Sequence, residues 1–265
     1  MILRDTDIDS ALSARARQRT LIEGRGPRVA EFLLNPYRFG GGGGGGSDPD
    51  FSSVSALLHM NGTNGGTSFP DVKGNAWTAA GSATTSTGYA FFSGSSGRFV
   101  ATASRISTPH FAGADLSTGD FTIEFLARLV TSSTFRVFVV KGPSTIFPSY
   151  LIQTSGTGRI NFAMGNSAGS AFVVNLTGTT ALATATDYFI SARRSGNMFS
   201  IAVNGSVEAS TTYTGALRSS ATDVLSVGAY PAGTDGVDAY MAELRITKGV
   251  ARSTITAPTA PFPNS

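Results

Sequence analysis

The sequence contains no cysteine, two histidines and one tryptophan among 265 residues. Without cysteine, disulfide bonds and thiolate metal sites are excluded. Charged residues make up only 14% of the chain, against roughly 25% in an average soluble protein. The surface must therefore be covered largely by Ser, Thr, Asn and Gly. Such a surface suits a protein displayed outside a cell or a particle, although many β-sandwich domains share this composition.

Long apolar runs are also missing. No stretch approaches the ~18 consecutive apolar residues of a membrane span, so we expect no membrane insertion. Asp5, Asp7 and Asp9 lie where a secretory signal would need an apolar run, and we do not expect secretory export. A displayed surface without such a signal is expected of a protein on a particle that is assembled in the cytoplasm and released by lysis. The net charge of +3 is scattered outside the N-terminal region, so we expect no nucleic-acid partner.

Residues 1–39 differ from the rest because they hold an Arg-rich stretch and then several large apolar side chains. A short helix is expected from Asp9 or Ser10 to about Leu21, with a thin apolar stripe that needs a partner to stay folded. We interpret this region as a segment that docks on other virion proteins, and a disordered tail is the alternative. The expected docking residues are Leu12, Phe32, Leu33, Leu34, Tyr37 and Phe39.

Residues 40–49 form the expected linker, because Gly40–Gly46 is an unbroken run of seven glycines. Glycine loses the most backbone entropy on ordering, so such a run favours a flexible tether. Eight residues of this kind span roughly 15 Å root-mean-square. The tether allows the β-like region after it to orient independently of the N-terminal segment before it.

Residues 50–265 have the pattern of one all-β domain, with about a dozen short strands separated by Gly, Ser, Thr and Asn. Apolar residues alternate along 121–129, and 135–140 is expected to be a buried strand. Ser195–Asn197 and Asn204–Gly205 are the expected turns of two successive hairpins. At the end of the domain, Ala242, Leu244 and Ile246 are expected to alternate with Glu243, Arg245 and Thr247.

Several segments together resemble the concanavalin-A-like jelly roll of the laminin-G-like type found in bacteriophage virion and tail-fibre proteins. Val54–Gly65 resembles the first strand and turn of that family, and Asp120–Phe125 resembles its central strand. The most specific likeness is Glu243–Arg252, followed by Ala257–Pro263. The resemblance covers about residues 50–263. It implies an all-β, two-sheet antiparallel jelly-roll sandwich used for adhesion or decoration, through sugar binding or protein contacts.

The chain lacks the catalytic patterns that this fold can carry. Glycoside hydrolases of this fold need two carboxylates about 5 Å apart, carried in the family by a Glu-x-Asp-x-x-Glu strand. Glu124 stands alone on its strand, while Asp238 and Glu243 are five residues apart and would point to opposite faces. We therefore expect no enzymatic activity and interpret Glu124 and Glu243 as rim or sheet-surface residues. Neither His59 nor His110 lies in a nucleophile motif, and His59 is expected to be structural.

Calcium is the cofactor that the resemblance raises. Relatives often carry Asp in the first turn and before the strand that corresponds to 243–247, where this chain has Asn61 and Ala242. Losing two carboxylates leaves Asn61, Asp71 and Glu243 as poor candidates for a metal site, because calcium needs six to eight oxygens. We expect no cofactor.

Carbohydrate binding requires an aromatic platform beside amide and acid groups on loops. Trp77, Tyr230, Asp235 and Asp238 are the candidates, and the loop 229–238 is the most site-like because it joins an aromatic residue to two acids. Packing in the core or at the rim is the alternative for each aromatic residue.

The order of the parts predicts a non-enzymatic bacteriophage virion protein: a capsid decoration, a head fibre or a short tail fibre. Its N-terminus would dock on the particle and its lectin-like domain would face outward, where it could bind a host surface glycan. Such proteins are often homo-oligomers, with a trimer expected here, because repetition multiplies a weak affinity. A polysaccharide-degrading glycoside hydrolase of the same fold is the alternative, and a bacterial surface adhesin is a third hypothesis.

Overall fold

The structure is a computed structural model that describes residues 46–265 except 93, 102 and 133. The chain divides into two units, residues 1–44 and residues 45–265, and the second is the β domain. The predicted docking segment, with Leu12, Phe32, Leu33, Leu34, Tyr37 and Phe39, lies outside the described residues. Within the described part, no helix is long and apolar enough to cross a membrane.

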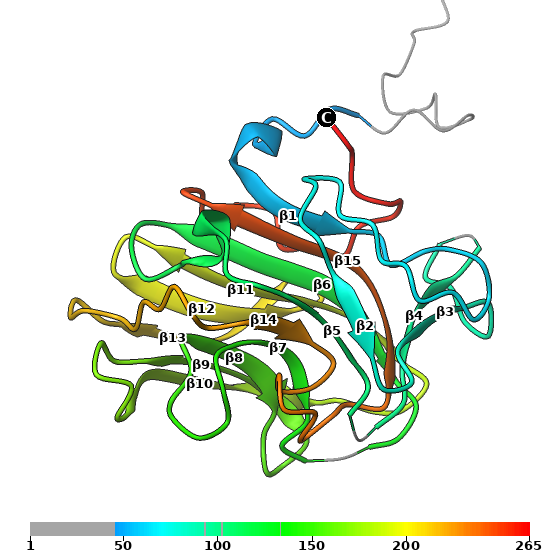
Figure 1. The fold of residues 1–265 in the computed structure, drawn as a ribbon. Coiled ribbons are helices and arrows are strands. Elements are labelled where there is room, and N and C mark those ends of the chain that lie inside the picture. The colour runs from blue at the N-terminus through cyan, green and yellow to red at the C-terminus, as the bar shows by residue number, and fades with distance from the viewer. Residues whose placement is uncertain (1–45, 93, 102, 133) are drawn as a thin grey trace, which may run out of the picture. The chain divides into compact units, whose positions relative to one another are not determined.

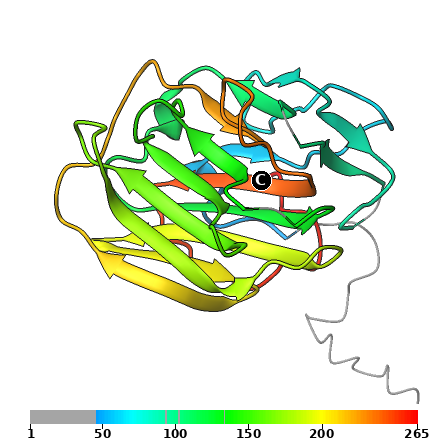
Figure 2. The same cartoon turned by 90° about the horizontal axis from the view of Figure 1, so that it is seen from below.

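The domain is a sandwich of two antiparallel sheets, which Figures 1 and 2 show as two layers. One sheet has eight strands in the order β13-β12-β11-β6-β15-β4-β3, with β1 paired to β15, and the other has seven in the order β10-β9-β8-β7-β14-β5-β2. The predicted two-sheet antiparallel fold is confirmed, with more strands than the dozen expected. The strands are β1 (Val54–Leu58), β2 (Thr78–Ala80), β3 (Thr84–Ser86), β4 (Ser96–Phe99), β5 (Arg105–Thr108), β6 (Phe121–Leu129), β7 (Val137–Lys141), β8 (Tyr150–Thr154), β9 (Arg159–Gly165), β10 (Phe172–Ala181), β11 (Asp187–Ser195), β12 (Met198–Val203), β13 (Ser206–Thr212), β14 (Leu225–Val227) and β15 (Ala239–Lys248), and two short 3-10 turns are η1 (Phe51–Ser53) and η2 (Ala112–Ala114).

The main core lies between the two sheets and follows from the alternation of β6. Phe121, Ile123 and Phe125 are fully buried and face the other sheet, where the Phe125 ring lies 5.6 Å from that of Phe138. Burying one such side chain contributes about 2–3 kcal/mol. Residues of the opposite parity, such as Glu124, therefore lie on the outer face of the eight-stranded sheet.

The two predicted hairpins are confirmed. Gly196 has a φ of 60° at the turn between β11 and β12. Asn204 and Gly205 have φ values of 48° and 90° between β12 and β13, which is the two-residue turn that this residue pair favours.

Two local expectations were wrong. The strand predicted to begin at Phe135 begins at Val137, because Phe135 has a φ of 55° and its side chain is exposed. The regular alternation predicted for the last strand is interrupted by a bulge at Glu243, whose φ is 54°. Both Met241 and Leu244 consequently face the core, with two residues between them instead of one.

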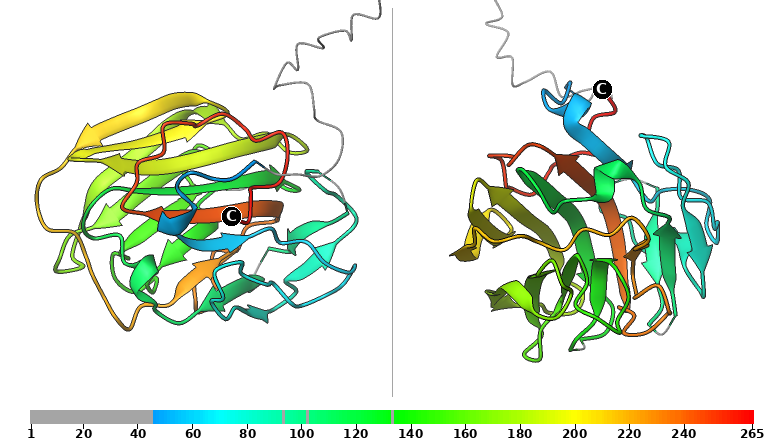
Figure 3. Two further views of the ribbon diagram at one scale, coloured as in Figure 1. Left: turned by 90° about the horizontal axis from the view of Figure 1, so that it is seen from above. Right: turned by 60° about the vertical axis from the view of Figure 1, so that its left-hand side comes forward.

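The two ends of the domain lie together on the outer face of the eight-stranded sheet (Figure 3). Asp48 N–H donates to the carbonyl of Ser265 over 2.8 Å. Residues 48 and 49, which the sequence placed in the linker, therefore contact the sandwich. The segment 251–265 has no regular structure, and its Phe262 completes a second apolar cluster on this face. The buried members of that cluster are Val54, Leu57, Leu126, Phe189 and Phe262.

Candidate functional site

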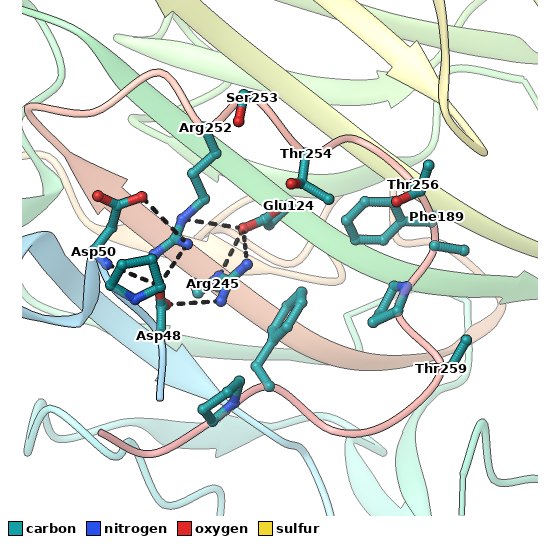
Figure 4. A pocket seen from close by; sticks show the side chains of 15 residues that line it. Asp48, Asp50, Glu124, Phe189, Arg245, Arg252, Ser253, Thr254, Thr256 and Thr259 are labelled. Carbon is teal, nitrogen blue, oxygen red and sulfur yellow. Dashed lines mark hydrogen bonds and ion pairs between the residues drawn. The ribbon is translucent and has the colours of Figure 1, made fainter. Parts of the chain in front are cut away.

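A pocket of about 530 Å³ lies between the start of the domain, the outer face of the eight-stranded sheet and the C-terminal segment (Figure 4). We call it the terminal pocket. Its volume is within the range of about 300–1,000 Å³ that is typical of small-molecule sites. Its lining is Asp48, Pro49, Asp50, Glu124, Phe189, Arg245, Arg252, Ser253, Thr254, Thr256, Ala257, Pro258, Thr259, Phe262 and Pro263.

The floor of the terminal pocket is an ionic pair across neighbouring strands. Glu124 on β6 and Arg245 on β15 are direct partners in the strand register, so their side chains leave the same face of the sheet. Arg245 donates from Nε and Nη2 to Oε1 of Glu124, each over 2.6 Å. Only 1% of Glu124 is exposed, so the charge of its carboxylate is balanced inside the protein.

A second pair ties the two ends of the domain to this floor. Arg252 donates from Nη1 and Nη2 to the two oxygens of Asp48, over 2.9 and 2.7 Å. Arg245 Nη1 also donates to Asp48 over 2.9 Å, and Arg252 Nε lies 3.5 Å from Glu124. Two arginines and two carboxylates thus form one buried network with no net charge, drawn as dashed lines in Figure 4.

The network shifts the pKa values of its two acids in opposite directions. For Asp48, burial raises the pKa, but the hydrogen bonds from Arg252 and from the backbone N–H of Asp50 outweigh it, so the pKa is lowered. For Glu124, burial raises the pKa, and the guanidinium groups of Arg245 and Arg252 offset only part of the rise. Both carboxylates are held by arginine, so neither is available as a nucleophile.

The mouth of the pocket combines hydroxyl groups with apolar surface. Ser253, Thr254, Thr256 and Thr259 are exposed residues of the C-terminal segment that line it. The ring of Phe262 forms part of the wall, with the Arg245 guanidinium 3.6 Å from its centroid. The arrangement offers hydrogen-bond donors and acceptors beside an aromatic ring, which suits a ligand with many hydroxyl groups.

Sequence reasoning missed this site. Glu124 was expected at the rim or surface of the sheet, and that expectation was wrong because the C-terminal segment covers the face on which it lies. Arg245 and Arg252 belong to the stretch with the most specific family likeness, but no role was assigned to them. The available signal was Glu124 between the apolar residues Ile123 and Phe125 and Arg245 between Leu244 and Ile246.

Glu243 is also buried, with 2% of the residue exposed, so its expected surface position was wrong as well. Its two carboxylate oxygens each lie 2.8 Å from Nδ1 of His59, and Oε2 accepts the backbone N–H of Phe262 over 2.8 Å. Nε2 of His59 lies 2.8 Å from Oδ1 of Asn264. His59 and Glu243 therefore hold the C-terminal segment on the sheet, which gives His59 the structural role that the sequence predicted.

We expect the His59 contact to make stability depend on pH. The hydrogen bond that His59 donates to the Glu243 carboxylate raises the pKa of His59 above its ordinary value of 6.5, although burial opposes it. Its contribution is therefore complete below pH 6.5 and is lost as pH rises through the folded-state pKa. The difference in unfolding free energy between the natural protein and His59→Gln, measured by urea titration at several pH values, should shrink as pH rises. A difference that stays constant from pH 5 to 9 would contradict this, and His110→Gln is the control.

The residues considered for calcium do not form one group. Asn61 and Glu243 line the same small pocket, but Asp71 lies elsewhere. One oxygen of Asp71 accepts the backbone N–H groups of Leu57 and Lys73, and the other accepts from Asn75 and Trp77. Among the described residues, no cluster of three or more His, Asp or Glu could hold a metal ion.

The four residues considered for carbohydrate are also divided. Trp77 packs against the core and donates from Nε1 to Asp71 over 3.1 Å. It precedes β2 at the Thr108 end of β5, whereas Tyr230 follows β14 at the opposite end of these paired strands. Trp77 and the predicted loop 229–238 therefore do not form a common surface.

Within that loop the two acids face different neighbours. Asp235 lies 4.0 Å from Arg136 and its side chain is 47% exposed, whereas Asp238 pairs with Arg98 over 2.6 Å and accepts from Thr131. Tyr230 is buried, and burial together with Asp235 raises its pKa to about 12. It lines a shallow groove of about 200 Å³ with Phe147 and Phe172.

Solved structures of other proteins share this fold, among them the binding domains of two toxins. The binding domain of paraclostridial mosquitocidal protein 1 matches with a TM-score of 0.58 and 10% identity, covering 76% of this chain and 50% of that one. The receptor-binding domain of botulinum neurotoxin type G matches with a TM-score of 0.55 and 11% identity, covering 77% and 49%. The chain thus spans about half the length of these toxin domains.

A third similar structure is domain 4 of a GH43 extracellular arabinanase from Geobacillus stearothermophilus, solved in complex with arabinotriose. It matches with a TM-score of 0.53 and 13% identity, covering 74% of this chain and 93% of that one. At these identities the likeness establishes the fold alone. No curated protein sequence matches the chain.

The sequence itself carries a family signature. Residues 100–254, more than half of the chain, match the concanavalin A-like lectin/glucanases superfamily of the laminin-G type. The match covers β5 to β15 and includes Glu124, Arg245 and Arg252 of the terminal pocket. The chain therefore belongs to the concanavalin A-like lectin/glucanases superfamily, as a lectin-like jelly-roll domain.

Proposed function

We propose that the protein is a non-enzymatic, glycan-binding component of a bacteriophage particle, and that its terminal pocket holds the sugar. The observation that carries glycan binding is the composition of the pocket: four hydroxyl side chains and an aromatic wall above a floor of paired ionic groups. Paired arginines and carboxylates present fixed donors and acceptors, which match the alternating hydroxyl groups of a sugar.

The charges of the pocket favour an uncharged sugar. Asp48, Glu124, Arg245 and Arg252 neutralise one another, and Asp50 is the one further charged residue among the described residues of the lining, 3.9 Å from Arg252. An acidic sugar would meet no unpaired cation in this lining. A neutral residue of a host surface polysaccharide is therefore the proposed ligand.

The particle role is proposed from the order of the parts along the sequence. A glycine run links an Arg-rich, apolar N-terminal region to a domain of weakly charged surface. One end would dock on other virion proteins, and the other would search for a glycan within the reach of the tether. Assembly as a homo-oligomer, with a trimer as the proposed state, would multiply a weak single-site affinity.

Filling the terminal pocket tests glycan binding. Ala257→Trp places a large side chain on the pocket lining, and we expect at least a tenfold loss of affinity, since losing even one well-packed contact costs about that much. Ala260→Trp makes the same change three residues later on the exposed segment, outside the lining, and should leave affinity unchanged. A glycan array with the full chain would find the ligand, and calorimetry would measure its affinity. Binding that is unaffected by Ala257→Trp would place the site elsewhere.

Hydrolysis is the second candidate function, because the terminal pocket holds one acid with a raised pKa and one with a lowered pKa. Such separation is the usual mark of an acid and its partner in glycoside hydrolases. The arginines that lie between Glu124 and Asp48 oppose this assignment. Release of reducing sugar from the bound polysaccharide by the purified protein would establish hydrolysis in place of simple binding.

A further inference from the structure

Phe135 is held in an unfavourable backbone conformation with its ring in solvent. It has a φ of 55°, in the left-handed region that side chains other than those of Gly and Asn avoid. Its residue surface is 57% exposed, the largest value among the exposed large apolar residues that the structure describes. Both features oppose stability. A phenylalanine in the left-handed region costs conformational energy, and an exposed ring contributes no hydrophobic stabilisation.

The surrounding backbone fixes this conformation. Arg136 N–H donates to Oγ1 of Thr154 over 2.8 Å, and the carbonyl of Arg136 accepts the N–H of Thr154 over 2.9 Å. Immediately afterwards, Val137 N–H donates to the carbonyl of Asp235 over 2.9 Å. Directly after Phe135, the chain is therefore held by Thr154 of β8 on one side and by Asp235 on the other. The Phe135 ring lies outside the strand pairing of β7.

The ring rests on a glycine of the neighbouring turn. A Cβ atom at Gly156 would lie only 2.9 Å from Cζ of Phe135, so any other residue there would displace the ring. Gly156 therefore lies against the outer end of the Phe135 ring, while more than half of the residue surface remains exposed. Gly156 belongs to the turn between β8 and β9, which brings a second loop to the position of Phe135.

Polar residues adjoin Phe135 and Gly156 along the chain, and Asp235 is brought near by the backbone hydrogen bond that its carbonyl accepts from Val137. Arg136 and Asp235 lie 4.0 Å apart with side chains that are 38% and 47% exposed. Ser155 and Thr157 add two exposed hydroxyl groups, 3.0 Å from each other, from the turn that contains Gly156. An open aromatic ring among hydroxyl, carboxylate and guanidinium groups has the composition of a sugar subsite.

We propose that Phe135 is a stacking platform for a sugar ring of the glycan, and that Arg136, Asp235 and Thr157 contact the hydroxyl groups of that ring. This second subsite rests on the proposed glycan-binding function but uses no residue of the terminal pocket. The apolar face of a pyranose ring would cover the exposed surface of Phe135. The strained backbone is then the cost of presenting the aromatic ring to a ligand.

The test separates strain from stacking. Phe135→Asn and Phe135→Gly remove the ring but suit the left-handed backbone, so both should keep or raise the Tm by up to about 2–4 °C. Both should weaken glycan binding by the full chain roughly tenfold, the size of one lost aromatic contact. Phe135→Trp should retain affinity, and Met198→Asn, which removes another exposed apolar side chain, should leave it unchanged.

Each outcome distinguishes the subsite from the proposed function. If Phe135→Asn and Phe135→Gly bind as tightly as the natural protein while Ala257→Trp does not bind, the platform is wrong and the terminal pocket stands. If the full chain binds no glycan, both the proposed function and the platform fail. A lowered Tm in both variants would show that Phe135 serves stability, and would overturn the proposal.

Discussion

Replacing Arg245 by methionine is expected to lower the free energy of unfolding by about 3–5 kcal/mol, because one partner of a buried ionic network is removed. Arg245 donates hydrogen bonds to both Asp48 and Glu124. Without it, Arg252 alone would face two buried carboxylates, and the apolar wall formed by Phe262 would lose its cation contact. Methionine retains most of the length of the side chain, so the loss reports the charge and not a cavity.

Urea unfolding followed by the fluorescence of Trp77, the only tryptophan, measures this loss. Arg128→Met is the matched control, since Arg128 pairs with Asp187 over 2.8 Å in a partly exposed position. Exposed pairs of this kind contribute about 0–1 kcal/mol. If the two variants lose the same stability, the network at the terminal pocket is not a main determinant of the fold of this face.

Deleting residues 1–39 is expected to abolish incorporation into particles while leaving glycan affinity unchanged. The proposed docking residues all lie in this region, and the proposed sugar contacts all lie after residue 47. The deleted protein should unfold at the same urea concentration as the full chain. Each form would be expressed in a host and the particles purified. Immunoblotting of these particles would then measure the fraction of each form that is incorporated.

Two sets of substitutions in the full chain identify what docks. Changing Phe32, Leu33 and Leu34 to Ser should reduce incorporation as strongly as the deletion, because apolar burial would supply the attachment. Changing Arg15, Arg17 and Arg19 to Gln is the matched control and should have a smaller effect. Normal incorporation of the deleted protein would place docking in another part of the chain.

The sequence was sufficient for the fold because the relevant signals are local. The alternation of Phe121, Ile123 and Phe125 assigns one face of β6 to the core, and the pair Asn204–Gly205 specifies a tight turn through its backbone preference. Such patterns repeat along the whole domain, and so they indicate a two-sheet sandwich without knowledge of which strands pair.

The candidate sites could not be predicted in the same way. Asp48 and Arg252 are 204 residues apart, with Glu124 between them in the sequence, and the three meet only because both ends of the domain cross the outer face of the sheet. Periodicity shows which face of a strand a side chain occupies but not what covers that face. Glu124 and Glu243 were for this reason expected near the surface although both are buried.

By itself, then, the sequence determined the all-β class, two hairpins and the absence of a family catalytic motif, because each depends on neighbouring residues. Only the tertiary structure decided that Arg245 and Arg252 neutralise Asp48 and Glu124 in one pocket, and that Phe135 lies before the start of β7 and faces solvent. The first outcome depends on contacts between segments far apart in the chain. The second depends on the left-handed backbone of Phe135, in a stretch whose sequence has the pattern of a strand.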